Sequence, residues 1–262
     1  MKRNALTHLN IPAIQEDELF SGYLDRLCVL NHLSMDELRA VITNNAHVTP
    51  SMFVNDVVTI INAAEQKMSA DEVYKRNTPF RILRFIMLKV EQETNSAILR
   101  ENRRIIKEFE NLHITPLYCP VCIEEDIKTA GSAWQHVYHN CGNVKACYKH
   151  HCKLVPGIDA ALNAQIETAD EESIAYADWL FKLSRIEGLD ACREKTSKLA
   201  FKTLSERFPD IYNNKSSGDL RILQAAYNRF RTYTLSDNDF LRLTFLLWHD
   251  RFEEFYEEYP RE

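Results

Sequence analysis

The feature that most constrains this chain is a cluster of cysteines and histidines between residues 118 and 155. Five of the seven cysteines and four of the nine histidines fall within this stretch. Two residues separate Cys119 from Cys122, and two separate Cys147 from His150. Thiolate and imidazole are the groups that zinc prefers, and this spacing lets a tight turn direct both side chains of a pair at one ion. The pattern therefore predicts a tetrahedral Cys₃His zinc site with a structural role.

Four further residues of the same stretch could also serve a metal, namely His139, Cys141, His151 and Cys152. His151 could replace His150, and Cys141 with Cys152 could form a second thiol pair. They could equally support the first site from outside, or be packed thiols and surface imidazoles. The sequence leaves open whether one or two zinc ions bind.

Other chemistries for the cluster receive less support. An odd number of cysteines disfavours a complete disulfide framework. The pair in Cys119-Pro-Val-Cys122 could be a redox dithiol, but no strand–helix context of the thioredoxin type surrounds it. A catalytic zinc needs an open coordination position and a general base. Glu124, Glu125 and Asp126 are close enough in sequence for that task, yet four good ligands favour a closed site. Nothing specific indicates a Cys–His nucleophile.

Composition predicts a mainly α-helical protein, because glycine is scarce, with 6 residues in 262, and good helix formers are common. We expect a helical domain at 1–111, a zinc-finger module at 112–157 and a second helical domain at 158–262. The expected helices span residues 16–31, 35–44, 50–66, 70–77, 79–94, 97–110, 169–187, 190–207, 219–231 and 237–259. The tight turn between the first two allows a helix-turn-helix, although a small helical bundle fits as well.

Four helix starts carry a capping-box pattern, in which the first side chain and the fourth satisfy each other's free backbone N–H groups. These patterns begin at Ser34, Ser69, Thr168 and Ser236. We therefore expect helices to begin directly after these four residues.

The net charge of −6 argues mildly against a protein dedicated to nucleic acid. Nine basic and three acidic residues nevertheless lie between 75 and 107. This stretch could meet phosphates or simply form a solvated helix face. The candidate phosphate contacts are Arg81, Arg84, Arg100, Arg103, Arg104 and Lys107. The start lacks an apolar signal region and no long apolar run follows, so we expect a cytoplasmic protein without a membrane partner.

The cluster also resembles the zinc-finger region of the TniQ/TnsD family, the target-selection proteins of bacterial transposons. That family pattern runs loosely CPxC…D…G…W…HQ…GV…CxxH…L. The residues that match it are Cys119, Cys122, Asp126, Gly131, Trp134, His139, Gly142, Cys147, His150 and Leu154. Segments on both sides of the cluster resemble the family more loosely. The departures include Gly22-Tyr23, where the family has Ser-Trp, and Asn140, where it has glutamine.

The resemblance implies a non-catalytic adaptor in DNA transposition. Such a protein links target DNA or a guide-RNA effector complex to an AAA+ transposition regulator similar to TnsC, and homodimer formation is left open. The resemblance also implies that Trp134 packs on the finger and that Asp126 and His139 support it. Two alternatives remain from the residues themselves. One is a zinc-stabilised helix-turn-helix DNA-binding regulator without a transposon role, and the other is a zinc hydrolase.

Overall fold

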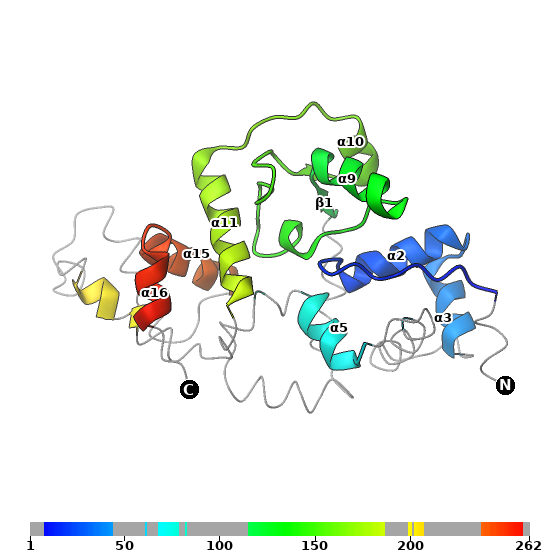
Figure 1. Ribbon diagram of the computed structural model, residues 1–262, viewed down its shortest axis with the longest axis horizontal. Helices are drawn as coiled ribbons and strands as arrows, with labels where there is room; N and C mark the ends of the chain where they lie inside the picture. The colour runs from blue at the N-terminus through cyan, green and yellow to red at the C-terminus, as the bar shows by residue number, and fades with distance from the viewer. Residues whose placement is uncertain are drawn as a thin grey trace.

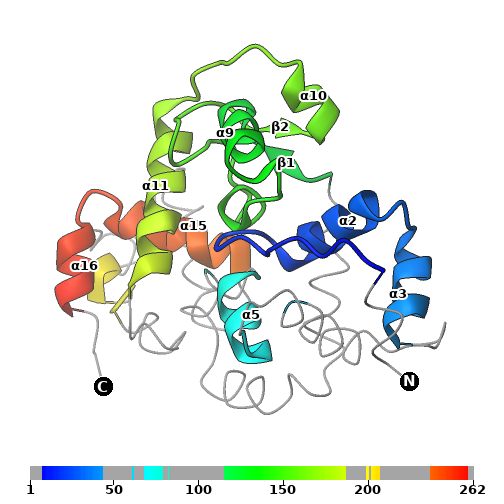
Figure 2. The same cartoon turned by 45° about the vertical axis from the view of Figure 1, so that its right-hand side comes forward.

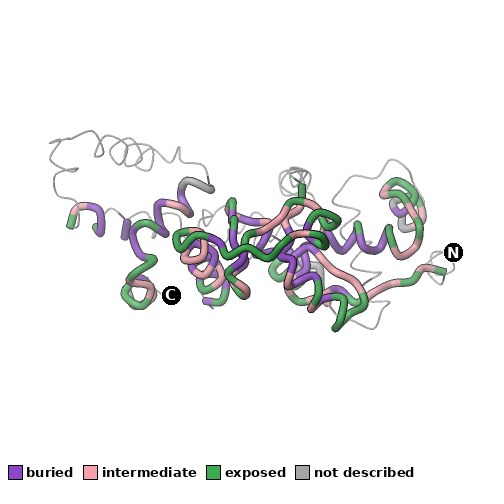
Figure 3. The backbone as a smooth tube through the Cα atoms, turned by 90° about the horizontal axis from the view of Figure 1, so that it is seen from above, coloured by how far each residue is buried: buried purple, intermediate pink, exposed green. Residues whose placement is uncertain are grey.

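In the computed structural model, the described residues are 8–43, 61, 68–78, 82, 115–186, 199–200, 202–206 and 237–258. They form a mainly helical structure with one small two-stranded sheet, which confirms the predicted fold class. The central segment, residues 115–157, lies between the N-terminal helices on one side and three C-terminal helices on the other (Figures 1 and 2). Buried and exposed stretches alternate along both of these flanking parts (Figure 3).

The N-terminal part contains α2 (Phe20–Leu30), α3 (Met35–Thr43) and α5 (Ala70–Arg76). Tyr23 and Leu27, which recur with helical spacing on α2, are fully buried and pack in one cluster with Leu38 and Val73. Helix α2 begins at residue 20 rather than at the predicted 16. The backbone before it is used elsewhere, because the N–H of Leu19 donates to the carbonyl of Gln135 at 2.7 Å.

Two of the four predicted capping boxes are confirmed, and the one at Ser236 lies outside the described residues. Ser69 caps α5 together with Glu72, and the Ser34 hydroxyl accepts from the Glu37 N–H at 3.2 Å, while the Glu37 carboxylate accepts from the Ser34 N–H at 2.7 Å. The third prediction is wrong. Asp170, not Thr168, caps α11 (Glu171–Arg185), by accepting from the N–H of Ser173. Thr168 instead forms a backbone bridge with Cys152.

The central segment is built around a short sheet and a helix. Strand β1 (Leu117–Tyr118) pairs antiparallel with β2 (Val155–Pro156), and α9 (Pro120–Ala130) follows β1 directly. Proline occupies the first turn of α9, where its missing N–H costs nothing, and Gly131 ends the helix at φ +75°. A 3₁₀ turn, η3 (Val137–His139), and the short helix α10 (Ile158–Leu162) complete this part. Neither α9 nor α10 was among the helices expected from the sequence.

The C-terminal part packs an aromatic core against the central segment. It contains α11, α15 (Asp237–Trp248) and α16 (Phe252–Glu258), so the single helix predicted at 237–259 is interrupted. The interruption lets α16 turn back, and Phe255 then meets Trp248 at 4.9 Å and Trp179 at 5.5 Å between ring centroids. Tyr176 of α11 donates from its hydroxyl to the carbonyl of Gly142 at 2.9 Å, which joins this core to the central segment.

Several expectations fall outside the described residues. The helices expected at 50–66, 79–94, 97–110, 190–207 and 219–231 lie wholly or mostly outside them. The same holds for all six candidate phosphate contacts, Arg81, Arg84, Arg100, Arg103, Arg104 and Lys107. Within the described part of the chain, no helix has the length and apolar character needed to cross a membrane.

Candidate metal centre

Two local turns present the predicted ligands in the same way. Cys119 is the N-cap of α9, and its sulfur accepts from the N–H of Cys122 at 3.4 Å. In the second turn, the sulfur of Cys147 accepts from the N–H of His150 at 3.4 Å. The second turn is closed by His151, which adopts φ +55° and donates its N–H to the Cys147 carbonyl. Hydrogen bonds from backbone N–H groups favour the thiolate, which is the form that binds metals.

The four ligand atoms of Cys119, Cys122, Cys147 and His150 all lie within 4.8 Å of one another. The sulfurs of Cys122 and Cys147 are 3.8 Å apart, which matches the edge of about 3.8 Å in a tetrahedron with zinc–sulfur bonds of about 2.3 Å. His150 Nδ1 lies 3.4, 3.3 and 3.6 Å from the sulfurs of Cys119, Cys122 and Cys147. A sulfur–nitrogen edge of about 3.5 Å is expected around zinc. This donor set can therefore hold one tetrahedral metal ion.

Burial explains why the site needs a cation. The three cysteines are between 0 and 3% exposed. The pKa values of Cys122 and Cys147 are raised, first because each faces the sulfur of Cys119. The pKa of Cys119 is lowered, first by its hydrogen bond with Cys122. Three crowded sulfurs can all be thiolates only if a positive ion lies between them, and a divalent metal supplies that charge.

Glu125 orients the imidazole ligand. His150 directs Nδ1 at the sulfurs, while its Nε2 lies 3.3 Å from Oε1 of Glu125. The same carboxylate binds the ammonium of Lys149, and this contact is the leading reason why the pKa of Glu125 is lowered. A carboxylate on the far nitrogen of a metal-bound histidine fixes its tautomer and raises its basicity. Glu125, considered from sequence as a catalytic base, is thereby engaged in holding a ligand.

The other candidate ligands have different surroundings. Cys152 is buried, with its sulfur 3.3 Å from that of Cys119. Cys141 packs instead in the hydrophobic cluster that includes Tyr176 and Leu180. His151 is about half exposed, and its Nε2 lies 3.7 Å from a carboxylate oxygen of Asp178. Among the described residues, the only group whose ligand atoms lie close enough together to hold a metal consists of Cys119, Cys122, Cys147 and His150.

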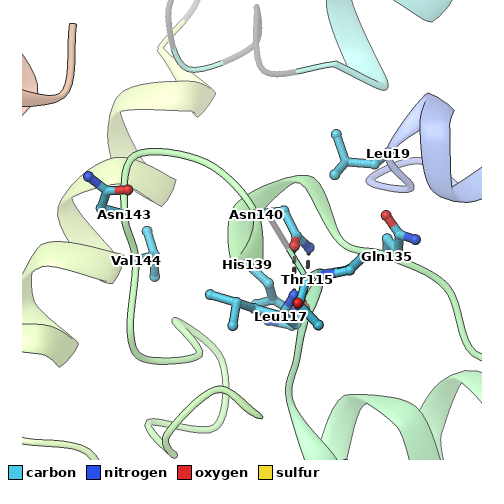
Figure 4. Close-up of a pocket in the computed structure, with 9 residues that line it drawn as sticks. Leu19, Thr115, Leu117, Gln135, His139, Asn140, Asn143 and Val144 are labelled. Carbon is cyan, nitrogen blue, oxygen red and sulfur yellow. Dashed lines mark hydrogen bonds between the residues drawn. The ribbon is translucent and has the colours of Figure 1, made fainter. Parts of the chain in front are cut away.

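His139 lies beside a small cavity of about 70 Å³ that is also lined by Asn140 and Leu117 (Figure 4). Its side chain is fully enclosed, and neither ring nitrogen has a hydrogen-bond partner in the described structure. Burial lowers the pKa of His139 to about 3, and the nearby charge of His136 acts in the same direction. Asn140 stands where the family has glutamine. Its side-chain oxygen accepts from the N–H of Leu117, and its side-chain nitrogen donates to the carbonyl of Leu117.

A second polar cluster, which the sequence did not predict, joins the central segment to the N-terminal part. His136 Nδ1 lies 2.6 Å from Oδ2 of Asp17, and its Nε2 lies 3.0 Å from Oδ2 of Asp126. Trp134 donates from its indole nitrogen to the other oxygen of Asp17 at 3.1 Å. We call Asp17, His136 and Asp126 the carboxylate–histidine bridge. Of these residues, the sequence singles out only Asp126 and Trp134. Trp134 is predicted to pack on the finger, and in the structure its indole also binds Asp17 of the N-terminal part.

Charge inside the bridge is balanced by its own members. Burial alone would lower the pKa of His136, but the hydrogen bonds that its ring N–H groups donate to Asp126 and Asp17 outweigh burial and raise the pKa to about 9. Burial would raise the pKa of Asp17, yet the hydrogen bond and charge of His136 keep it below its ordinary value. His136 is therefore an imidazolium at neutral pH, and it lies between the side chains of Asp17 and Asp126.

Comparison with known proteins decides the family. A model of the TniQ family matches residues 10–154, more than half of the chain. The chain belongs to the TniQ family. The match spans α2, both halves of the metal centre and all three members of the carboxylate–histidine bridge in this TniQ-family protein. Membership points to a role related to target selection in transposition. No curated protein matches the chain.

Proposed function

We propose that this TniQ-family protein is a non-catalytic adaptor that links a target site to an AAA+ transposition regulator similar to TnsC. The target side is either target DNA itself or a guide-RNA effector complex. The observation that carries the proposal is the family match over residues 10–154. Within that span, buried contacts hold the metal centre and the N-terminal helices together, which suits a rigid docking unit.

The metal in this proposal is one structural Zn²⁺ held by Cys119, Cys122, Cys147 and His150. A zinc ion bound there would cross-link the start of α9 to the turn at 147–150, which Glu125 of α9 also contacts through Lys149 and His150. Four donors fill a tetrahedron, so no coordination position is left for a substrate. The closed donor set, together with the engagement of Glu125 by His150, supports a structural rather than a hydrolytic centre.

The proposal also retains the division of the chain. Residues 1–111 form an N-terminal helical domain, 112–157 the zinc-finger module and 158–262 a C-terminal helical domain. The hydrogen bond from Tyr176 to Gly142 and the carboxylate–histidine bridge support a module that is fixed on both sides. A partner that binds either helical domain would then be held in a fixed position relative to the finger.

The charge of α3 argues against the alternative of a helix-turn-helix DNA reader. In that motif the first residues of the second helix face the base edges of the major groove. Here the first turn of α3 presents Asp36 and Glu37, both exposed. Hydrogen bonds from the Ser34 backbone and hydroxyl lower the pKa of Glu37, so it is ionised at neutral pH. Two carboxylates at this position would repel the phosphates of a duplex.

The test is binding to an AAA+ ATPase encoded beside the gene for this chain. Purified wild-type protein and the Cys122→Ser variant are each passed over the immobilised ATPase with ATP or with ADP. We expect nucleotide-dependent retention of the wild type and loss of retention with the variant. Retention of neither protein in either nucleotide would contradict the adaptor proposal.

A parallel titration separates the adaptor from the DNA-binding alternative. Duplex DNA of random sequence is titrated with the protein at 50 and 200 mM salt, and fluorescence anisotropy is measured. A DNA regulator would bind tightly and lose roughly a thousandfold in affinity over this range. We expect weak binding at both salt concentrations by the protein alone.

A further inference from the structure

Cys152 places a fifth donor beside the metal centre. Its sulfur lies 3.3 Å from that of Cys119, and its side chain is 2% exposed. It packs in one buried cluster with Cys119, Cys122 and Cys147. The other buried thiol nearby, Cys141, belongs to a different cluster. Proximity to the ligands therefore distinguishes Cys152 from an ordinary buried cysteine.

The backbone holds Cys152 in this position from two sides. Its carbonyl accepts from the N–H of the ligand Cys147 at 2.9 Å, and its neighbour Lys153 is bridged to Ala146. On the other side Cys152 is bridged to Thr168. The sulfur consequently stays within reach of the site unless the turn that carries two of the four ligands is itself broken.

We propose that Cys152 is a fifth donor of the metal centre. It donates its S–H to the thiolate of Cys119 in the Cys₃His centre, and it replaces His150 as a ligand when that imidazole is removed. The inference rests on the proposed zinc site and extends it. A metal-bound Cys119 is a thiolate with no proton, so the proton between the two sulfurs belongs to Cys152.

The distances agree with this assignment. The 3.3 Å between Cys119 and Cys152 is shorter than the roughly 3.8 Å edge between two sulfurs bound to one zinc. It fits a hydrogen bond between sulfurs, and Cys152 is not one of the four described residues whose ligand atoms all lie within 4.8 Å of one another. When Cys152 becomes a ligand, its S–H bond breaks, a sulfur–metal bond forms and the proton passes to solvent. No oxidation is involved, and the centre gains one negative charge.

The first experiment measures the hydrogen bond through zinc affinity. Wild type, Cys152→Ala and the matched control Cys141→Ala are compared by competition with a chromophoric chelator, under a phosphine reductant. We expect Cys152→Ala to weaken zinc binding about tenfold or more, as loss of a hydrogen bond to a ligand typically does. Cys141→Ala should leave the affinity unchanged. Equal affinities of all three proteins would overturn the native role of Cys152.

The second experiment counts thiolates after the histidine is removed. Wild type, His150→Ala and His150→Ala/Cys152→Ala are titrated with Co²⁺, and the sulfur-to-cobalt charge-transfer absorbance is recorded per bound ion. We expect His150→Ala to retain one Co²⁺ with absorbance higher by about one third, because four thiolates replace three. The double variant should lose that gain.

The outcomes separate this inference from the zinc site on which it rests. If wild type binds neither zinc nor cobalt, the metal site itself is refuted. If wild type binds one ion with three thiolates but His150→Ala shows the same three-thiolate absorbance with and without Cys152, only the replacement of His150 by Cys152 is refuted. In that case water has taken the open position.

Discussion

The metal centre and the carboxylate–histidine bridge are two solutions to one physical problem. Each gathers buried acidic groups around an imidazole, and the two share neighbouring residues, Glu125 and Asp126, on α9. In the bridge, His136 is a cation between the side chains of Asp17 and Asp126. In the candidate metal centre, an imidazole that binds a metal through its lone pair would contribute no charge, so three thiolates would need a cation from outside. The first cluster should thus respond to metal, and the second to pH.

Removal of the metal has the largest expected effect. Cys122→Ser should lose the ion, and the central segment should unfold, because metal binding supplies on the order of 10 kcal/mol to small structural sites. Metal content by elemental analysis and thermal unfolding by circular dichroism check this. Cys141→Ala is the control that should keep both metal and fold. A variant without metal whose melting temperature equals that of wild type would refute a structural role for the site.

Removal of the cation of the bridge comes next. His136→Gln leaves Asp17 and the nearly buried Asp126 without a positive partner, and breaking a buried ion pair in this way costs about 3–5 kcal/mol. Urea unfolding of the metal-loaded protein measures the loss. The double variant with Asp17→Asn should recover part of it. If His136→Gln costs under 1 kcal/mol, the bridge is not an essential joint.

The stability of the protein should also depend on pH, because the pKa values of the two buried histidines, His136 and His139, are shifted in opposite directions. The pKa of His136 is about 9 when folded, above an unfolded value near 6.5. This group therefore contributes stability that is fully present below pH 6.5 and is lost as pH rises through 9, by roughly 3 kcal/mol. His139 has the opposite sign. With a folded pKa of about 3, it costs stability as pH falls below 6.5.

Urea unfolding at intervals between pH 6.5 and 9.5, with metal in excess, tests the first of these effects. The fall in the free energy of unfolding with rising pH should be smaller in His136→Gln than in wild type, and unchanged in a surface control such as His8→Gln. Equal slopes in wild type and His136→Gln would show that His136 is not protonated in the folded protein.

How much of this could be predicted from sequence depends on how local the signal is. The four residues that could hold a metal form two pairs with a spacing of three, and the Ser34 and Ser69 caps form within one helical turn, so both follow from short patterns. The bridge does not, because Asp17 and His136 are 119 residues apart and meet only after the chain has folded. The sequence does not predict helix α9, because the pattern Cys119-Pro-Val-Cys122 indicates metal ligation rather than a helix start. In the structure Cys119 caps α9 and also contributes its sulfur to the candidate metal centre.

Close packing at the bridge gives a smaller effect. A Cβ atom added at Gly22 would lie 2.6 Å from the Cβ of Gln135, next to the residues of the bridge. Gly22→Ala should therefore separate α2 from residues 134–136 and destabilise the protein by about 2 kcal/mol, as overpacking commonly does. Gly131→Ala is the contrasting control, since its Cβ would meet no atom within 4 Å and would carry only the strain of φ +75°. Thermal unfolding of both variants decides, and a larger loss in Gly131→Ala would contradict the packing argument.

The smallest expected effect concerns Glu125, the carboxylate that contacts the far nitrogen of His150. Glu125→Gln removes the charge on the far side of His150 while keeping an oxygen that can accept its Nε2–H. Because Glu125 is 42% exposed, water can replace part of the interaction. We expect zinc affinity to fall only about tenfold, the low end for groups that support a metal ligand. Glu124→Gln, one residue away and paired with Lys128 on the surface, is the matched control and should not change it. A thousandfold loss in Glu125→Gln would mean that the metal centre depends on the charge of Glu125 despite its exposure to water, and the contrast with the bridge would then fail.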